Sequence, residues 1–337
     1  MFWEWGGLPV QVTIIGAGSW GTALAYLVAS KGHQVVLWSR RNEVACEINR
    51  TRVNATYLPV ALPSCVRATS CIEEAIDSTG LIILTVPSQN IRGVLQQMTG
   101  LVDSKVPIVH GAKGIEISTQ LRISQVAEEV LGRPIAALSG PNHAEEAANN
   151  MPTASVVAFD DLGTGKVIQE ILSTDRFRVY VERDVVGVEL GGALKNVIAL
   201  AAGISDGLGY GDNTKAALIT RGLAEIVRLG VRLGAEPLTF SGLSGLGDLV
   251  ATCSSKWSRN RNAGEKIGKG CDLQEVLAGP MVVEGVYTTT AACRLAETIG
   301  VELPIASTLE RVLGGSVSPK AAVDELMTRQ LKLERPF

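Results

Sequence analysis

The stretch that decides the fold is Val12-Thr13-Ile14-Ile15-Gly16-Ala17-Gly18-Ser19-Trp20-Gly21, near the start of the chain. An apolar run leads directly into the pattern G-x-G-x-x-G, and Thr22–Lys31 then continues as a predicted helix. In this setting Gly16 permits a tight turn, Gly18 lets a pyrophosphate approach the backbone, and Gly21 lets the helix pack closely on the strand. The N–H groups at the start of the helix favour the phosphates. We therefore predict a dinucleotide-binding unit.

Apolar runs and amphipathic segments alternate through the first half of the chain. Strands are expected at residues 10–15, 34–38, 81–86, 107–110, 135–138, 154–159 and 177–180, and helices at 22–31, 89–98 and 118–131. Such alternation predicts a mostly parallel sheet covered by helices, so we expect an α/β, doubly wound Rossmann-type domain over residues 8–183. Beyond it, helices are expected at 185–204, 213–233, 291–299 and 306–313, which predicts a second, all-helical domain over residues 184–330.

Composition excludes several classes of protein. The 337 residues carry 31 Lys+Arg and 34 Asp+Glu, a net charge of −3, which argues against nucleic-acid or membrane-surface binding. With 46% hydrophobic and 19% charged residues, the chain is expected to be globular, and no apolar run approaches the length of a membrane span. The N-terminal MFWEW segment lacks the pattern of a secretory signal. Six scattered cysteines without zinc-ligand spacing predict a reduced, cytoplasmic protein without a metal site.

The residues after the second predicted strand bear on the choice between NAD and NADP. An acidic residue there would bind the ribose 2′-hydroxyl of NAD. This chain has Trp38-Ser39-Arg40-Arg41 instead, and two guanidinium groups can pair with a 2′-phosphate. We therefore favour NADP(H), while Glu43, a little further on, keeps NAD(H) as an alternative.

Two loops follow predicted strands at the edge where a parallel sheet binds ligands. The first contains Lys113 within Gly111–Gly114, and the second is Ser139–His143. Each is a candidate contact to nicotinamide or substrate. The alternative for each is an ordinary turn, with Lys113 as a surface charge.

A further lysine, Lys195, lies in an apolar helical run, Glu189–Asn196. Such a lysine either extends its ammonium to the surface or lies in a cleft. In a cleft, desolvation and a neighbouring cation such as Lys113 would favour the neutral amine that a general acid or base needs near pH 7. With only three histidines in the chain, a lysine is the stronger candidate for proton transfer.

The segment Gly242–Leu249 is rich in glycine and carries one acid, Asp248. It is followed by Ser258–Asn262, a polar cluster with arginines that is typical of a small-anion site. The alternative is an exposed helix N-terminus with capping residues.

Together these segments resemble the NAD-dependent glycerol-3-phosphate dehydrogenase family. The resemblance extends from about Val10 to Leu313 and includes GAGSWGTALA, AKGIE, SGPN, GLSGLGDLVATC, SRNR and VVEGV. It implies reduction of dihydroxyacetone phosphate to sn-glycerol 3-phosphate with NAD(P)H, which supplies the glycerophospholipid backbone. It also implies a homodimer.

By position, the resemblance makes Lys195 the residue that exchanges a proton with the substrate oxygen, supported by Asp248 and Thr252. The implied substrate contacts are Lys113, Gly140, Asn142, Lys195, Asp248, Ser258, Arg259 and Asn260. The implied cofactor contacts are Gly16, Gly18, Ser19, Trp20, Gly21, Arg40, Arg41, Lys113, Ala144, Arg259, Val282 and Glu284. Asn142 stands where the family often has a hydroxyl residue.

Two other functions remain open on the residues alone. A related lysine-dependent β-hydroxyacid-type dehydrogenase would bind a carboxylate where this family binds a phosphate. A non-catalytic NADP sensor would lack a general acid or have a blocked cleft. Arguing against it is the joint presence of Lys113, Lys195, Asp248 and Arg259.

Overall fold

The structure is a computed structural model that describes residues 9–279, 281–331 and 333–334. The chain divides into two compact units. Among the described residues, the first contains those up to Ala112, Ile123–Leu138 and Asn142–Val185, and the second contains Lys113–Arg122, Ser139–Pro141 and those from Val186 onward. Residue 8, the predicted start of the first domain, and the MFWEW segment lie outside the described residues.

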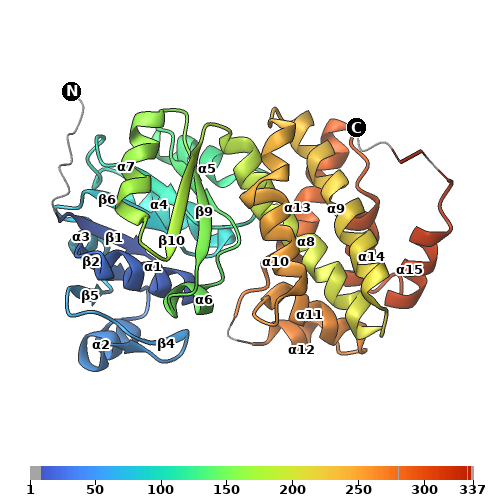
Figure 1. Ribbon diagram of the computed structural model, residues 1–337, viewed down its shortest axis with the longest axis horizontal. Helices are drawn as coiled ribbons and strands as arrows, with labels where there is room; N and C mark the ends of the chain where they lie inside the picture. Colours follow the sequence, from blue (N-terminus) through green and yellow to red (C-terminus); the bar gives the residue numbers. More distant parts are fainter. Residues whose placement is uncertain (1–8, 280, 332, 335–337) are drawn as a thin grey trace. The chain divides into compact units, whose positions relative to one another are not determined.

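The first unit is built on an eight-stranded sheet in the order β10-β9-β8-β7-β6-β1-β2-β5 (Figure 1). Its strands are β1 (Gln11–Ile15), β2 (Gln34–Trp38), β5 (Val66–Thr69), β6 (Leu81–Leu84), β7 (Ile108–His110), β8 (Ala136–Ser139), β9 (Thr153–Ala158) and β10 (Phe177–Glu182). The pairs β1–β2, β1–β6, β2–β5, β6–β7, β7–β8 and β9–β10 are parallel. From β5 to β8 the order is that of the Rossmann sheet, so the predicted fold is confirmed.

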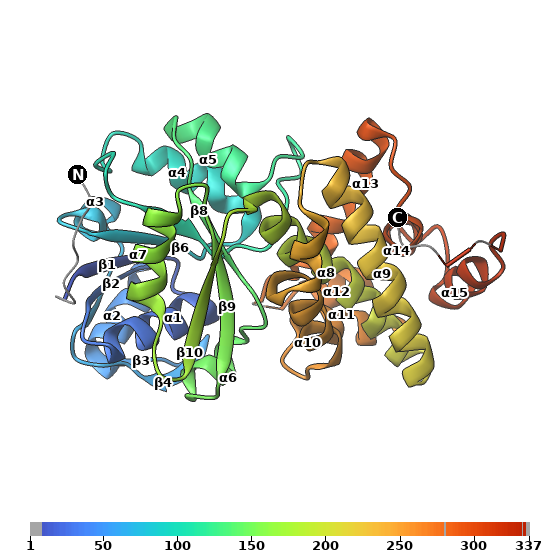
Figure 2. The ribbon, with the colours of Figure 1, turned by 45° about the horizontal axis from the view of Figure 1, so that its top comes forward.

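Helices cover both faces of this sheet. They are α1 (Ser19–Ser30), α2 (Asn42–Thr51), α3 (Ile72–Ile76), α4 (Ile91–Met98), α5 (Ile123–Leu131), α6 (Ala144–Ala148) and α7 (Leu162–Leu172), with a 3₁₀ turn η1 (Ser88–Asn90). Figure 2 shows α4 and α5 together on one side of the sheet and α1 on the other. A short antiparallel pair, β3 (Val53–Asn54) and β4 (Leu58–Ala61), lies beside α1. Because both faces are covered, central strands such as β6, sequence LIIL, are buried at every residue.

The second unit is helical in the part that the structure describes. Its helices are α8 (Val185–Gly207), α9 (Asp212–Arg232), α10 (Asp248–Ser254), α11 (Arg259–Gly268), α12 (Leu273–Leu277), α13 (Glu284–Ile299), α14 (Pro304–Leu313) and α15 (Pro319–Met327). Two short turns precede α10, the 3₁₀ turn η2 (Pro237–Ser241) and the π-helical turn η3 (Leu243–Gly247). The unit has its own apolar core, in which α8 is the central contributor.

One helix corrects the expectation that no segment approaches a membrane span. By length and composition alone, α8 is long and apolar enough to cross a bilayer. However, 83% of the apolar 18-residue stretch of α8 is buried within the protein. A mainly apolar helix with that burial is the core helix of its unit.

Other expectations also differ from the structure. The helix expected at residues 291–299 begins earlier, at Glu284. The helix expected at residues 118–131 begins only at Ile123, because Gln120 has φ 58°, in the left-handed region that an α-helix excludes. The strand β5 was missed, since its four residues include Arg67 and lie at the edge of the sheet, where the apolar pattern is weak.

Candidate active site

The glycine-rich turn after β1 has the shape that its sequence predicts. Gly16 has φ 121°, and a Cβ at Gly21 would lie 1.8 Å from the Gly16 carbonyl oxygen, so both positions require glycine. By contrast, a Cβ at Gly18 would have nothing within 4 Å. The turn is therefore closed where strand and helix meet, and open at the position through which a pyrophosphate would approach.

Two residues, Asn54 of β3 and Tyr57 in the turn between β3 and β4, brace this turn, and no sequence motif indicated them. The fully buried Asn54 donates from Nδ2 to the Ala17 carbonyl oxygen at 2.9 Å and to Thr22 Oγ1 at 2.8 Å. Ser19 Oγ donates to the Tyr57 carbonyl oxygen at 2.9 Å. The turn is thus held from outside as well as by its own glycines.

Trp20 lies on the first turn of α1, next to the loop after β7. A Cβ at Gly111 would lie 2.7 Å from its indole Nε1, which is buried and makes no hydrogen bond to the described residues. The ring also packs on the apolar group that contains Ala144, the first residue of α6. An unsatisfied buried donor beside a glycine loop fits a bound polar group at this position.

The two arginines after β2 differ in their surroundings. Arg40 is exposed, whereas the Arg41 guanidinium lies 5.6 Å from the centre of the Tyr57 ring and donates to the Tyr57 hydroxyl at 3.2 Å. An ion pair of 3.8 Å links Arg41 to Glu43. Tyr57 was not identified from the sequence, because it is 16 residues away from Arg41.

In the second unit, three charged side chains that are far apart in the sequence form one buried cluster. Lys195 Nζ donates to Asp248 Oδ1 at 2.5 Å and to Thr252 Oγ1 at 2.8 Å. Lys113 Nζ donates to Asp248 Oδ2 at 2.8 Å and to the Gly140 carbonyl oxygen at 2.9 Å. The two carboxylate oxygens of Asp248 therefore accept hydrogen bonds from two different lysines.

Burial and charge set the protonation of this cluster. Desolvation lowers the pKa of Lys195 from 10.5 to about 7, with Asp248 opposing this and Lys113 adding to it. Burial by itself would raise the pKa of Asp248, but Lys113 and Lys195 together outweigh it and hold that pKa below its usual value. Near pH 7 the aspartate is therefore ionised, while Lys195 can give or take a proton.

Glycines bring the elements of this cluster close together. A Cβ at Gly191 of α8 would lie 2.5 Å from the Ser244 carbonyl oxygen of η3, and one at Gly192 would lie 2.5 Å from Ser139 Oγ. An ion pair between Arg122 and Glu189 ties the segment that carries Lys113 to α8. The Gly-rich segment before Asp248 thus serves packing, which its sequence alone left undecided.

The predicted anion-binding residues lie at the start of α11. Ser258 caps the helix, its Oγ accepting from the Arg261 N–H at 3.2 Å, while Arg259 is exposed. Asn260 is buried; its Nδ2 donates to Asn196 Oδ1 at 2.9 Å, and its Oδ1 accepts from the Gly285 N–H at 2.8 Å. The helix cap and the exposed arginine are thus both present at one helix start.

The remaining predicted contacts lie elsewhere in their units. Asn142 belongs to the first unit and donates from Nδ2 to Ser155 Oγ at 2.9 Å. Val282 and Glu284 lie in the second unit, Val282 just before α13 and Glu284 at its first residue. Of the predicted substrate contacts in these two loops, Lys113 and Gly140 are joined by the hydrogen bond described above.

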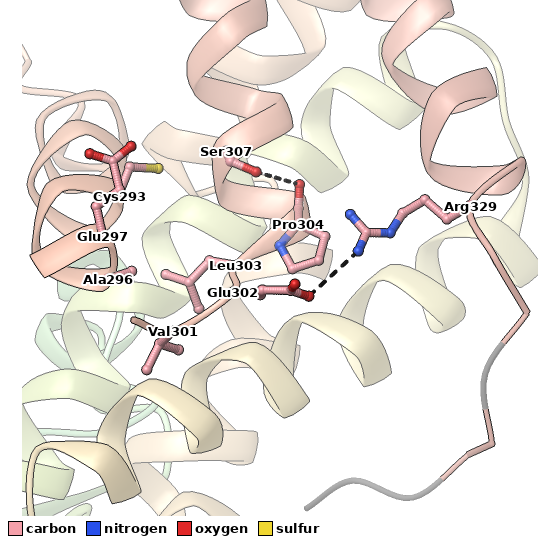
Figure 3. Close-up of a pocket in the computed structure, with 9 residues that line it drawn as sticks. All are labelled: Cys293, Ala296, Glu297, Val301, Glu302, Leu303, Pro304, Ser307 and Arg329. Carbon is pink, nitrogen blue, oxygen red and sulfur yellow. Dashed lines mark hydrogen bonds and ion pairs between the residues drawn. The ribbon is translucent and has the colours of Figure 1, made fainter. Parts of the chain in front are cut away.

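A cavity of about 260 Å³ in the second unit contains none of the predicted site residues (Figure 3). The residues that line it are Cys293, Ala296, Glu297, Val301, Glu302, Leu303, Pro304, Ser307 and Arg329. An ion pair of 3.9 Å between Arg329 and Glu302 lies at this cavity. The pocket supplies no buried general acid comparable to Lys195.

Comparison with known proteins assigns the family. The model of the NAD-dependent glycerol-3-phosphate dehydrogenase N-terminus matches residues 11–164, and that of the C-terminus matches residues 184–324. The chain belongs to the NAD-dependent glycerol-3-phosphate dehydrogenase family.

Members of the family from bacteria are similar over nearly the whole chain. Glycerol-3-phosphate dehydrogenase [NAD(P)+] of Halalkalibacterium halodurans is 51% identical over 330 residues, which is 96% of this chain and 95% of the relative. That of Lysinibacillus sphaericus is also 51% identical, over 96% of this chain and 98% of the relative. A crystal structure of glycerol-3-phosphate dehydrogenase from Coxiella burnetii matches with a TM-score of 0.92 and 40% identity, covering 95% of this chain and 99% of that one. The family resemblance inferred from the sequence is confirmed.

Proposed function

We propose that this chain is an oxidoreductase that reduces dihydroxyacetone phosphate to sn-glycerol 3-phosphate, reversibly, with NADPH or NADH. The observation that carries the proposal is the buried Lys195, bonded to Asp248 and Thr252 in a chain of this family. The two relatives at 51% identity, which are matched over 95% and 98% of their length, are named for that activity.

Lys195 acts as the general acid. A nicotinamide cofactor, when bound, supplies the hydride that reaches the carbonyl carbon of the substrate. As negative charge grows on the carbonyl oxygen, the Lys195 ammonium stabilises it and donates its proton. In the reverse direction the neutral amine accepts that proton. A pKa of about 7 allows both roles near neutral pH.

Asp248 and Lys113 support that transfer. Asp248 accepts hydrogen bonds from both lysines. It therefore fixes the position of the Lys195 amine, which can still gain or lose a proton. Lys113 keeps a second positive charge in the cluster, which lowers the pKa of Lys195 and stabilises the developing oxyanion.

The start of α11 binds the substrate phosphate. The exposed guanidinium of Arg259 is suited to a phosphate, and Ser258 and Asn260 flank it. Gly140 and Asn142 complete the substrate contacts. The second unit is then the substrate-binding domain, with its boundary near residue 184.

The first unit binds the dinucleotide, with NADP(H) preferred to NAD(H). Two observations support its fit: the open position at Gly18 and the unsatisfied indole N–H of Trp20. Arg40 and Arg41 would pair with the 2′-phosphate, with Tyr57 steadying Arg41. The remaining proposed contacts to this cofactor are Gly16, Ser19, Gly21, Lys113, Ala144, Arg259, Val282 and Glu284.

The setting of the reaction follows from the family resemblance. We infer a cytoplasmic enzyme that works as a homodimer and supplies the backbone of glycerophospholipids.

The test is the absorbance at 340 nm of purified protein with dihydroxyacetone phosphate and either NADPH or NADH. We expect NADPH to be oxidised faster. Equal rates with both cofactors would retain the reaction and reject the 2′-phosphate preference. If a folded protein that binds cofactor oxidises neither, the substrate assignment fails, and 2-keto and 3-keto acids are the next substrates to assay.

A further inference from the structure

Two helices of the second unit, α8 and α11, approach each other backbone to backbone. Each carries two glycines four residues apart, Gly203 and Gly207 on α8 and Gly264 and Gly268 on α11. A Cβ at any of the four would lie 1.9 to 2.3 Å from a carbonyl oxygen of the opposite helix. Since real Cβ atoms do not come so close, these four positions, here called the glycine seam, set the spacing of the two helices.

An ion cluster fastens the same two helices beside the glycine seam. Asp206 of α8 pairs through Oδ2 with Arg261 of α11 at 2.6 Å, and through Oδ1 with Lys215 of α9 at 2.8 Å. Arg261 also pairs with Glu265 at 3.3 Å. The side chains of Asp206 and Arg261 are only 12% and 18% exposed, so solvent screens this pair less than a surface pair.

The part of α11 held in this way is the turn that carries the phosphate-binding residues. Arg261 lies two residues after Arg259, and its N–H is bound by the helix cap. The amide of Asn260 bonds to that of Asn196, the residue that follows Lys195 on α8. Asn196 in turn donates to the Lys113 carbonyl oxygen at 3.0 Å. Any displacement of α11 along α8 would therefore change the distance between the phosphate site and the lysine cluster.

We propose that the glycine seam and the Asp206–Arg261 ion pair are positioning elements, which fix the phosphate-binding turn of α11 at the distance from Lys195 that the substrate spans. The proposal rests on the function proposed above. None of these side chains is expected to touch the substrate; each acts through Arg259 and Asn260.

The first test is Gly264→Ala, because its Cβ would lie 2.0 Å from the Leu200 carbonyl oxygen and must push α11 away. A shift near 1 Å is expected to raise the KM for dihydroxyacetone phosphate about 100-fold. The inhibition constant of inorganic phosphate, used as a competitive probe, should rise in parallel. By contrast, kcat should change about threefold or less, since Lys195 stays in place.

The matched control is Gly93→Ala. Gly93 is also a helical glycine, but it is exposed on α4 and a Cβ there would have nothing within 4 Å. This variant should keep the wild-type KM and phosphate inhibition, with an equal or higher melting temperature.

A second variant covers the case in which Gly264→Ala does not fold. Asp206→Asn keeps the shape of the side chain but removes the charge that holds Arg261 and Lys215. We expect the KM and the phosphate inhibition constant to rise together about tenfold, with kcat nearly unchanged. Unchanged constants in the folded variants would overturn the proposal, and so would a fall in kcat and melting temperature without a change in KM.

Failure of the proposed function gives a different result. In that case wild-type protein oxidises neither cofactor in the presence of dihydroxyacetone phosphate. Calorimetric titration with inorganic phosphate then still tests whether the glycine seam and the ion pair position the phosphate-binding turn. Weaker binding to both variants than to wild type supports the positioning role, and equal binding, or none to wild type, rejects it.

Discussion

The glycine-rich turn after β1 is formed by six consecutive residues, whereas the lysine cluster joins Lys113, Lys195 and Asp248 from up to 135 residues apart. Glycine has a different use in each. In the turn, Gly18 leaves space that a ligand can enter; beside the cluster, Gly191 removes a side chain so that helix and turn can touch. Neighbouring residues in the sequence can thus form a turn that binds a cofactor. A buried proton donor such as Lys195, by contrast, requires distant segments to pack around it.

The largest effect should come from the cluster. Lys195→Ala removes the proposed general acid and is expected to lower kcat for dihydroxyacetone phosphate by about a thousandfold. NADPH binding, followed by fluorescence titration, should remain near the wild-type value because the glycine-rich turn is untouched. Lys166→Ala, at an exposed position on α7, is the control and should keep full activity. Turnover within tenfold of wild type in Lys195→Ala would refute the assignment.

The second prediction contrasts two glycines of the turn. Gly18→Ala has room for its methyl group in the protein alone, so the melting temperature should hold while NADPH affinity falls about 100-fold through the clash with phosphate. Gly21→Ala has no such room, because its Cβ would meet the Gly16 carbonyl oxygen, and it should lose both stability and binding. Equal melting temperatures for the two variants would contradict this distinction.

The third prediction concerns pH. Because burial lowers the pKa of Lys195 to about 7, kcat for the reduction should be level below pH 7 and fall about tenfold per pH unit above it. The reverse reaction needs the neutral amine and should rise up to the same pH. Folding should show the matching linkage: between pH 7 and 10.5 the unfolded chain holds a proton that the folded chain has released, so stability rises with pH. A reduction profile that stays flat to pH 9 would exclude Lys195 as the acid.

The smallest effect should come from the exposed rim of the cofactor site. Arg41→Ala removes one partner for a 2′-phosphate and should raise the KM for NADPH about tenfold, with little change for NADH. Tyr57→Phe keeps the ring under Arg41 but removes the hydroxyl that accepts from it, so its effect should be smaller still. Parallel changes for both cofactors would assign Arg41 to the part of the dinucleotide that NAD and NADP share.

The sequence predicted the fold well wherever apolar periodicity was strong. Strands such as β6 and long helices such as α8 and α9 agree with expectation within a few residues. The weak edge strand β5 and the delayed start of α5 do not, because tertiary pairing and one left-handed residue decide them. The periodicity of apolar residues predicts which segments are buried. It does not predict which strand a short polar segment pairs with.

The candidate site was predictable to a similar degree. Lys113, Lys195 and Asp248 were each marked by an unusual setting, a charge in an apolar or glycine-rich segment, and the structure brings them within hydrogen-bonding distance. Asn54 and Tyr57 were not found, since their contacts to Thr22 and Arg41 depend on how β3 and β4 lie against α1. Such contacts have no local signature.

The division of the chain into two interleaved units has a consequence for synthesis on the ribosome. The chain passes from one unit to the other at 112/113, 122/123, 138/139, 141/142 and 185/186. Lys113 therefore leaves the ribosome well before Asp248, and at ordinary translation rates the delay is roughly ten seconds. During that time the strands of the first unit can pair. The segment that carries Lys113 cannot yet pack, because the helices of the second unit have not been synthesised. Because of these five crossings, no single break in the chain separates the two units. A break at 185/186 would leave Lys113 on one segment and Lys195 and Asp248 on the other.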